Sequence, residues 1–466
     1  MRFDDTIFAL ASAPGKSAVA IVRLSGDAAG EAVCRLTGGE LPPPRQAELR
    51  RLADPRADPR ADPHADPHAD PRADPHNDAE IDRALVLWFP GPASYTGEDV
   101  AEFHVHGGRA VIAALLSALG AMTGLRPAEA GEFSRRAFEH GKLDLTAAEG
   151  VADLVDAETE IQRRQALRQS RGVLGELYDD WRRRLLKIRA LVESTIDFSD
   201  QELPSGVLDP VAPEIHAISA EISAHLHDDG RGERLREGVQ VAILGPVNAG
   251  KSSLFNRLAG RDAAIVASEE GTTRDVIEVR MDLAGWPLTV ADTAGLRVAT
   301  SDVEAEGMRR ARARAAGADL KIVLLDGARW PNGGEEAEGL VDNETLTVLN
   351  KCDLLADQAV EACFGGKPAL KISCRTGEGL DALLARIKEF LEARYLPSDS
   401  PVLTRSRHRH ALEKCLESLR RYDIDVGEEL AAEELRLAAD SLGRITGRSD
   451  IEQVLDIIFK DFCIGK

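Results

Sequence analysis

Cysteine is scarce in this chain, with six in 466 residues, and no two of them stand at Cys-x-x-Cys spacing. Neither a disulfide framework nor a zinc site is therefore indicated. Long apolar runs are absent as well, and no stretch approaches the length that crosses a membrane. The first residues, MRFDDTIFALAS, contain early aspartates and too short an apolar run for a signal peptide. We expect a cytoplasmic protein that does not contact membranes.

Positive charge is also in deficit, because 58 lysines and arginines face 79 acidic residues and leave a formal net charge of −21. This balance argues against non-specific wrapping of nucleic acid, but it does not exclude a local basic patch. Arginines gather in residues 156–200, and a second basic group lies at 405–410. The first run fits a solvated helix face with i,i+4 pairing and a contact with RNA phosphates equally well.

The stretch VAILGPVNAGKSSLFNRL contains the most specific motif of the chain. Its β-branched start predicts a buried parallel strand, which is followed by Gly245-x-x-x-x-Gly250-Lys251-Ser252 and a helix. This context predicts a phosphate-binding loop, in which backbone N–H groups and the helix N-terminus hold the β-phosphate. Lys251 would reach the β- and γ-oxygens, and Ser252 would bind Mg²⁺. The nucleotide ligands predicted here are Asn248, Ala249, Gly250, Lys251, Ser252 and Ser253.

Further nucleotide-binding motifs follow in order along the chain. Asp353, in the sequence Asn-Lys-Cys-Asp, can accept hydrogen bonds from the guanine N1–H and 2-amino groups, which adenine does not offer. A threonine of GTTRD can complete the Mg²⁺ shell, and Gly295 of DTAG can turn toward a γ-phosphate. Together the motifs predict a guanine-nucleotide-binding domain. They add the predicted ligands Thr272, Thr273, Asp292, Thr293, Ala294, Gly295, Asn350, Lys351, Asp353, Ser373, Cys374 and Arg375.

The residue that follows DTAG is Leu296. Many GTPases place a glutamine there to orient the attacking water, and a leucine cannot form that hydrogen bond. Hydrolysis must therefore use another group, from this chain or from a partner. Glu304 is a nearby candidate, and the alternative is a solvated carboxylate at the start of a helix.

The pattern of the whole chain predicts a multidomain α/β and α protein. Residues 1–120 are expected to be α+β, residues 121–237 and 397–466 helical, and residues 238–396 a doubly wound α/β domain inserted between the helical halves. Residues 53–78 are of low complexity and repeat Ala-Asp-Pro-Arg/His six times. Regular prolines forbid helix and sheet, so this segment is predicted to be an extended surface excursion.

Outside the nucleotide motifs, three features leave two interpretations open. Arg23 lies within an apolar strand and is either a surface or edge residue or a buried anion clamp. One face of a predicted strand carries Glu102, His104 and His106. These residues form either a metal or acid/base site or the polar face of a half-exposed strand. Cys463 near the chain end is either a nucleophile or a small hydrophobe that caps the last helix.

Motifs along nearly the full chain resemble those of the MnmE (TrmE) family of tRNA modification GTPases. They are DDTIFALAS, VRLSG, LWFPGPASYTGEDV, GEFSRRAF, KLDLTAAEG, DFSD, NAGKSSLFNRL, GTTRD, DTAGLR, NKCD and the terminal FCIGK. The resemblance implies a tetrahydrofolate-binding domain that dimerises, a helical domain and an inserted Ras-like domain. It also implies a complex, heterotetrameric or larger, with the flavoprotein MnmG (GidA). Such proteins add an aminomethyl or carboxymethylaminomethyl group to C5 of the wobble uridine, position 34, of certain tRNAs.

The resemblance also assigns residues to cofactors. A 5-formyl- or methylene-tetrahydrofolate supplies the one-carbon unit, and the matching folate positions are Arg23, Glu102, Lys142 and Lys466, with Cys463 close by as a nucleophile. Potassium takes the place of an arginine finger, and its matching ligands are Asn248, Ala267, Glu269 and Thr272. Ser252 and Thr273 match the Mg²⁺ ligands. Glu304 matches the residue that orients water when two GTPase domains pair. The potassium ion would offset charge on the leaving oxygen.

The chain departs from the family's pattern in three places. The phosphate loop has Gly-Pro-Val-Asn where Gly-x-Pro-Asn is usual, Cys374 replaces an alanine, and the Ala-Asp-Pro repeat is an addition. A competing interpretation is an RNA-binding regulatory or ribosome-assembly GTPase without modification activity, which should not bind folate. A third is a folate-dependent one-carbon transferase that has lost its own catalysis.

Overall fold

The computed structural model describes residues 5–57, 79–198, 206–228, 230–260, 264–265, 278–291, 317–332, 335–355, 362–395, 401–449, 452–460 and 462–465. The chain forms two compact units, residues 1–152 with 443–466 and residues 153–442. Most of the Ala-Asp-Pro repeat lies outside the described residues. The domain bounds given above stay a prediction.

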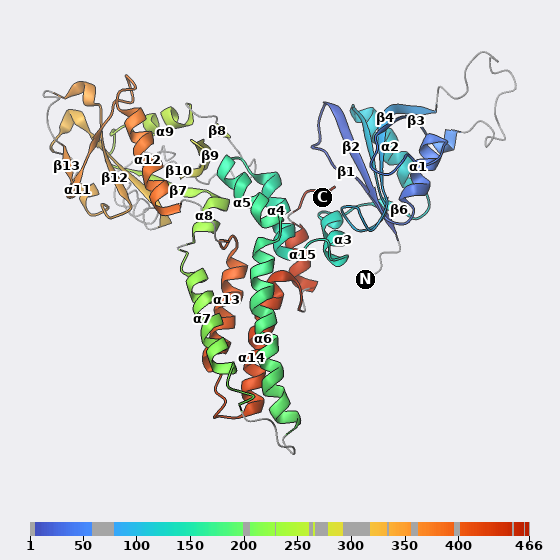
Figure 1. Cartoon of the computed structure of the whole chain (residues 1–466). Helices are drawn as coiled ribbons and strands as arrows, with labels where there is room; N and C mark the ends of the chain where they lie inside the picture. Colours follow the sequence, from blue (N-terminus) through green and yellow to red (C-terminus); the bar gives the residue numbers. More distant parts are fainter. Residues whose placement is uncertain are drawn as a thin grey trace, which may run out of the picture. The chain divides into compact units, whose positions relative to one another are not determined.

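The first unit contains a six-stranded sheet in the order β3-β4-β5-β2-β1-β6 (Figure 1). All of its pairings are antiparallel except that of β1 with β6. The strands are β1 (Thr6–Leu10), β2 (Ser17–Ser25), β3 (Glu48–Ala53), β4 (Glu80–Phe89), β5 (Val100–Gly107) and β6 (Leu125–Pro127). Alternating apolar residues of these strands form one core with helices α1 (Ala29–Thr37) and α2 (Arg109–Gly120), so one face of the sheet is covered.

The other elements of this unit gather around the chain end. Helices α3 (Glu132–Glu139) and α15 (Glu452–Lys460) contact each other, and α4 (Leu145–Asp156) shares an apolar cluster with α15. A bridge between Ala130 and Ile464 attaches the last residues next to α3. The fully buried Arg136 of α3 pairs with Asp5, Glu98 and Glu132. Because a buried guanidinium requires such partners, these contacts fix α3 and the loop before β5 against the sheet.

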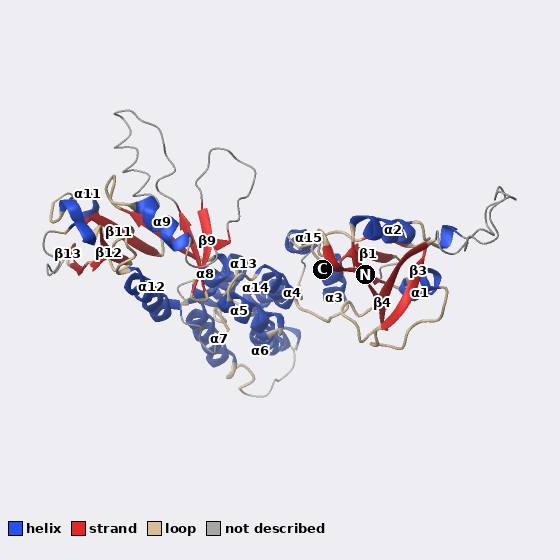
Figure 2. Ribbon diagram, turned by 90° about the horizontal axis from the view of Figure 1, so that it is seen from above, coloured by secondary structure: helices blue, strands red, loops and turns tan. Residues whose placement is uncertain are grey.

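The second unit has a helical part made of α5 (Glu160–Ser170), α6 (Val173–Asp197), α7 (Val211–Leu226), α13 (Ser406–Arg421) and α14 (Glu428–Thr446). Figures 1 and 2 show α6, α7, α13 and α14 side by side. Its arginines are largely paired: Arg163 and Arg164 with Glu160, Arg184 with Glu214 and Glu221, and Arg189 with Glu193. These pairs favour the solvated-helix interpretation over an RNA contact for the arginines concerned.

The rest of the second unit is a seven-stranded sheet in the order β15-β12-β11-β7-β10-β9-β8. Its strands are β7 (Val239–Leu244), β8 (Ala264–Ile265), β9 (Glu278–Leu283), β10 (Trp286–Ala291), β11 (Leu320–Asp326), β12 (Thr345–Asn350) and β15 (Leu370–Lys371). The pairs among β7, β10, β11, β12 and β15 are parallel, and β8 and β9 are antiparallel additions. A separate two-stranded ribbon joins β13 (Cys363–Phe364) and β14 (Lys367–Pro368).

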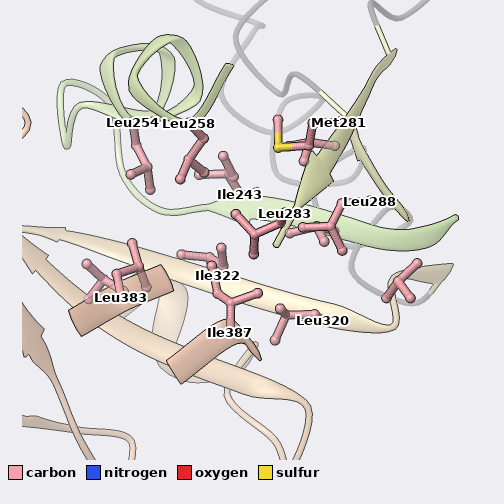
Figure 3. Packing of buried hydrophobic residues seen from close by; sticks show 14 of the residues in the cluster. Ile243, Leu254, Leu258, Met281, Leu283, Leu288, Leu320, Ile322, Leu383 and Ile387 are labelled. Carbon is pink, nitrogen blue, oxygen red and sulfur yellow. The ribbon is translucent and has the colours of Figure 1, made fainter. Parts of the chain in front are cut away.

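Apolar residues cover both faces of this sheet, as a parallel sheet requires. On one face, Leu254 and Leu258 of α9 (Lys251–Ala259) and Leu383 and Ile387 of α12 (Leu380–Tyr395) pack against the strands (Figure 3). Helix α8 (Arg231–Glu237) joins that core, and α11 (Glu335–Glu338) contributes to the core of the opposite face. The predicted fold class, α+β and helical parts with a doubly wound nucleotide-type domain, is confirmed. No helix in the described part of the chain is long and apolar enough to cross a membrane.

Candidate functional site

The phosphate-binding loop follows the buried strand β7. Gly245 has φ of +137°, and a Cβ there would lie 2.1 Å from the Leu324 carbonyl oxygen. Gly250 has φ of +97°, and a Cβ there would lie 2.2 Å from Nδ2 of Asn350. Both glycines are therefore required by close approach as well as by their backbone conformation. Between them Asn248 is left-handed, at φ of +64°, and Lys251 Nζ donates to the carbonyls of Gly245 and Pro246 at 2.9 Å.

Asn350 joins this loop to the base-recognition segments. It ends β12 and is 2% exposed. Its Nδ2 donates to the Ala249 carbonyl at 2.8 Å, and its Oδ1 accepts from the Cys374 N–H at 3.0 Å. One buried amide thus holds the phosphate loop and the loop of Ser373, Cys374 and Arg375 in one arrangement. Because each bond satisfies a buried polar group, replacing the amide disturbs both loops together.

Asp353 and Lys351 lie on either side of this bridge. Lys351 Nζ pairs with Asp326 at 2.7 Å, at the end of β11. Asp353 accepts hydrogen bonds from Ser373 Oγ and from Arg375 Nη2, each at 2.6 Å. The Ser373 hydroxyl and the Arg375 guanidinium hold the pKa of the Asp353 carboxyl below its usual range. Asp353 is therefore an ionised acceptor at neutral pH, as recognition of two guanine donors requires.

The phosphate loop and the base loops open onto one cavity of about 400 Å³. It is lined by Gly250, Ser253, Asn350, Lys351, Asp353, Leu354, Ser373, Cys374 and Arg375. The structure thus brings together residues predicted from motifs about one hundred positions apart. The remaining predicted nucleotide and metal residues lie outside the described residues: Ala267, Glu269, Thr272, Thr273, Asp292, Thr293, Ala294, Gly295 and Glu304.

A second predicted group meets in the first unit. Arg23 Nε and Nη2 both lie 2.9 Å from Glu102 Oε1, across paired strands β2 and β5. Arg23 Nη1 also donates to the Gly465 carbonyl at 3.4 Å, so the chain end contacts the pair. The guanidinium carbon lies 5.7 Å from the ring centroid of Tyr95 and 5.9 Å from that of Phe133. Arg23 is therefore not an edge residue: it lies in an internal strand and is held on several sides.

The other candidates of the first unit are placed more loosely. Lys142 Nζ donates to the Pro92 carbonyl at 3.0 Å. Cys463 is exposed, and Lys466 lies outside the described residues. His104 pairs with Glu102, and His106 with Asp82. Within the described ranges no group of three or more His, Cys, Asp or Glu could hold a metal ion, so the metal interpretation of this strand face is not supported.

Comparisons with known proteins cover nearly the whole chain. A family model described as GTP-binding protein TrmE N-terminus matches residues 6–142, and one described as MnmE helical domain matches residues 145–463. The tRNA modification GTPase MnmE of Paramagnetospirillum magneticum is 51% identical over 462 residues, which are 99% of this chain and 100% of that protein. This chain belongs to the MnmE family of tRNA modification GTPases. As a member of this family it is a GTP-hydrolysing enzyme of tRNA modification.

Relatives of the family occur in animals as well. The human mitochondrial protein named 5-taurinomethyluridine-[tRNA] synthase subunit GTPB3 is 48% identical over 478 residues, 99% of this chain and 93% of that protein. Among solved structures, the G domain of the T. maritima FeoB iron transporter is 27% identical and covers 33% of this chain and 98% of that chain. The TM-score of this match is 0.24.

Sequence reasoning missed several residues of both sites in this family member. Arg257 of α9 donates to the Cys374 and Arg375 carbonyls at 2.9 Å and fixes the base loop. Asp326 could have been found, because it ends a buried parallel strand at the edge where ligands bind. Tyr95 and Phe133 lie within motifs shared with the family, but nothing in their spacing indicates that both rings face Arg23.

Proposed function

We propose that the cavity between the phosphate loop and Asp353 binds GTP, and that GTP hydrolysis there drives tRNA modification. The observation that carries this proposal is the bridge by Asn350, which connects the phosphate loop to the base loop around a single cavity. Asp353 selects guanine through its two acceptor oxygens, and Lys251 contacts the β- and γ-phosphates. GTP, rather than ATP, is therefore the substrate.

Two cations complete this proposed site. Ser252 is exposed in the first turn of α9, and a hydroxyl oxygen there suits Mg²⁺. Thr273 is the second proposed Mg²⁺ ligand. Potassium is proposed to bind through Asn248, Ala267, Glu269 and Thr272, where it would offset charge that develops on the leaving oxygen. Glu304 is proposed to orient the attacking water when the GTPase domains of two copies pair.

The Arg23–Glu102 pair is proposed to bind the tetrahydrofolate derivative. The pair is half-buried and offers charged donors next to a carboxylate, which suits a ligand with both donors and acceptors. Lys142 and Lys466 are proposed to contact the same ligand. The Gly465 carbonyl at Arg23 supports a role for the chain end, and exposed Cys463 is proposed as a nucleophile close to the one-carbon unit.

The proposed reaction needs a partner. The human relative is named as a subunit of a synthase, which supports a complex. We assign the partner role to the flavoprotein MnmG, which would supply redox chemistry while this chain, as a cytoplasmic homodimer, supplies folate and GTP hydrolysis. The product would be an aminomethyl or carboxymethylaminomethyl group at C5 of the wobble uridine of tRNA.

Reconstitution tests this function. Purified chain, MnmG, unmodified tRNA, GTP and methylene-tetrahydrofolate are combined, and the wobble nucleoside is measured by mass spectrometry. The modified nucleoside should form only with every component present, and Cys463→Ser should abolish it while GTP hydrolysis continues. Modification without folate would remove the folate proposal. GTP hydrolysis with no modification under any condition would favour a regulatory or assembly GTPase.

A further inference from the structure

Each of the two oxygens of the base-recognising carboxylate accepts a hydrogen bond from a group of the chain itself. Asp353 Oδ1 accepts from Ser373 Oγ, and Oδ2 accepts from Arg375 Nη2. The Asp353 side chain is 12% exposed, so little of it faces water. A guanine base recognised by this carboxylate brings two donors, its N1–H and its 2-amino group, to the same two oxygens.

Arg375 is the partner that can leave. Its backbone is anchored, because Arg257 holds the carbonyls of Cys374 and Arg375. Its side chain is 75% exposed, and within the described residues its only ion-pair partner is Asp353. The loop therefore stays in place while the guanidinium can move into water, where its charge is solvated at little cost.

We propose that Arg375 is an internal competitor of the base site, which competes with guanine for Asp353 and so limits nucleotide association. This inference rests on the proposed function, because it takes Asp353 to be the guanine acceptor. Guanine binds only the fraction of molecules in which Arg375 has released the carboxylate, and the apparent affinity falls by that fraction. An exposed ion pair of this kind lowers the fraction of molecules in which Arg375 has released Asp353 by about 1.4- to 5-fold.

The contact also explains how an ionised carboxylate lies at the cavity with little exposure. An uncompensated charge there would attract other cations, whereas the Arg375 pair satisfies Asp353 until a base replaces it. Guanine replaces the lost donor with one of its own. Arg375 therefore occupies the base site reversibly. Because it must leave before guanine binds, it affects the association rate of the nucleotide more than the dissociation rate.

The test is stopped-flow binding of fluorescently labelled GDP to the full-length chain. Arg375→Ala should raise the association rate constant and tighten the dissociation constant by the same factor, about 1.4- to 5-fold, with an unchanged dissociation rate. Arg386→Ala is the matched control, because it removes another exposed, ion-paired arginine of the same sheet domain. The control should bind GDP as the wild type does.

The same substitution in an Asp353→Asn background isolates the contribution of the Arg375–Asp353 ion pair. In Asp353→Asn, measured with xanthosine diphosphate, the carboxylate is gone, so the gain from Arg375→Ala should disappear. Unchanged or weaker GDP binding by Arg375→Ala would overturn the proposal, as would an equal gain in both backgrounds. Failure of the wild type to bind any guanine nucleotide would instead overturn the proposed function itself.

Discussion

His225 offers a quantitative test of the helical part of the second unit. It lies in α7, with its Nε2 3.1 Å from the Tyr178 hydroxyl and its ring 5.6 Å from that of Trp181. Burial among these rings lowers the pKa of His225 from 6.5 to about 4, and nearby Arg409 also lowers it, while Asp228 opposes the shift. The folded chain therefore keeps this histidine neutral at pH values where the unfolded chain is protonated.

The sign of the pH effect follows directly. Between pH 6.5 and about 4 the unfolded state binds a proton that the folded state does not, so stability rises with pH in this range. Acidification to pH 5 should remove about 2 kcal/mol from the stability of this region through His225 alone. His225→Phe removes the titration and keeps a ring, although it also loses the bond to Tyr178.

Hydrogen exchange of the α7 amides, corrected for intrinsic exchange at each pH, measures the local opening free energy. The wild type should lose about 2 kcal/mol more than His225→Phe between pH 7 and pH 5. His216→Phe, a change of an exposed histidine in the same helix, is the control and should behave as the wild type does. Equal losses in wild type and His225→Phe would refute the argument that His225 is held neutral by burial.

Three further predictions concern the nucleotide site. Asn350→Ala breaks both loop contacts and should weaken GDP binding by about 2 kcal/mol, or roughly 30-fold, in equilibrium titration; wild-type affinity would show that the bridge does not organise the cavity. GTP hydrolysis should be much faster in potassium than in sodium buffer at equal ionic strength, and equal rates would contradict the potassium site at Asn248. Glu304→Ala should slow hydrolysis while GTP affinity is kept, and an unchanged rate would remove Glu304 from the mechanism.

The phosphate and base loops were the most predictable parts of the molecule. Gly245 and Gly250 are set by local backbone geometry, and the polar ends of β7 and β12 meet because parallel strands end at one edge of a sheet. Spacing alone was therefore sufficient to place Asn350 and Asp353 with the phosphate loop. The doubly wound sheet followed from the same alternation of apolar strands and helices.

Contacts between distant segments could not be predicted. The Gly465 carbonyl reaches Arg23 only because the chain returns 442 residues later to lie beside α3. Two partners of Arg184, Glu214 and Glu221, lie on α7, so composition could not decide between a paired arginine and an RNA contact. The bond from Arg375 to Asp353 depends on the conformation of an exposed side chain, which no motif encodes.

An altered nucleotide tests most directly whether the GTPase site drives tRNA modification. In Asp353→Asn the new amide donates where the carboxylate accepted, so the variant should prefer XTP to GTP. In the reconstituted reaction we measure the modified wobble uridine formed by wild type and variant with each nucleotide. If the site drives modification, the wild type should modify tRNA with GTP and the variant should do so with XTP. Equal modification by the variant with GTP, or none with XTP despite XTP hydrolysis, would contradict it.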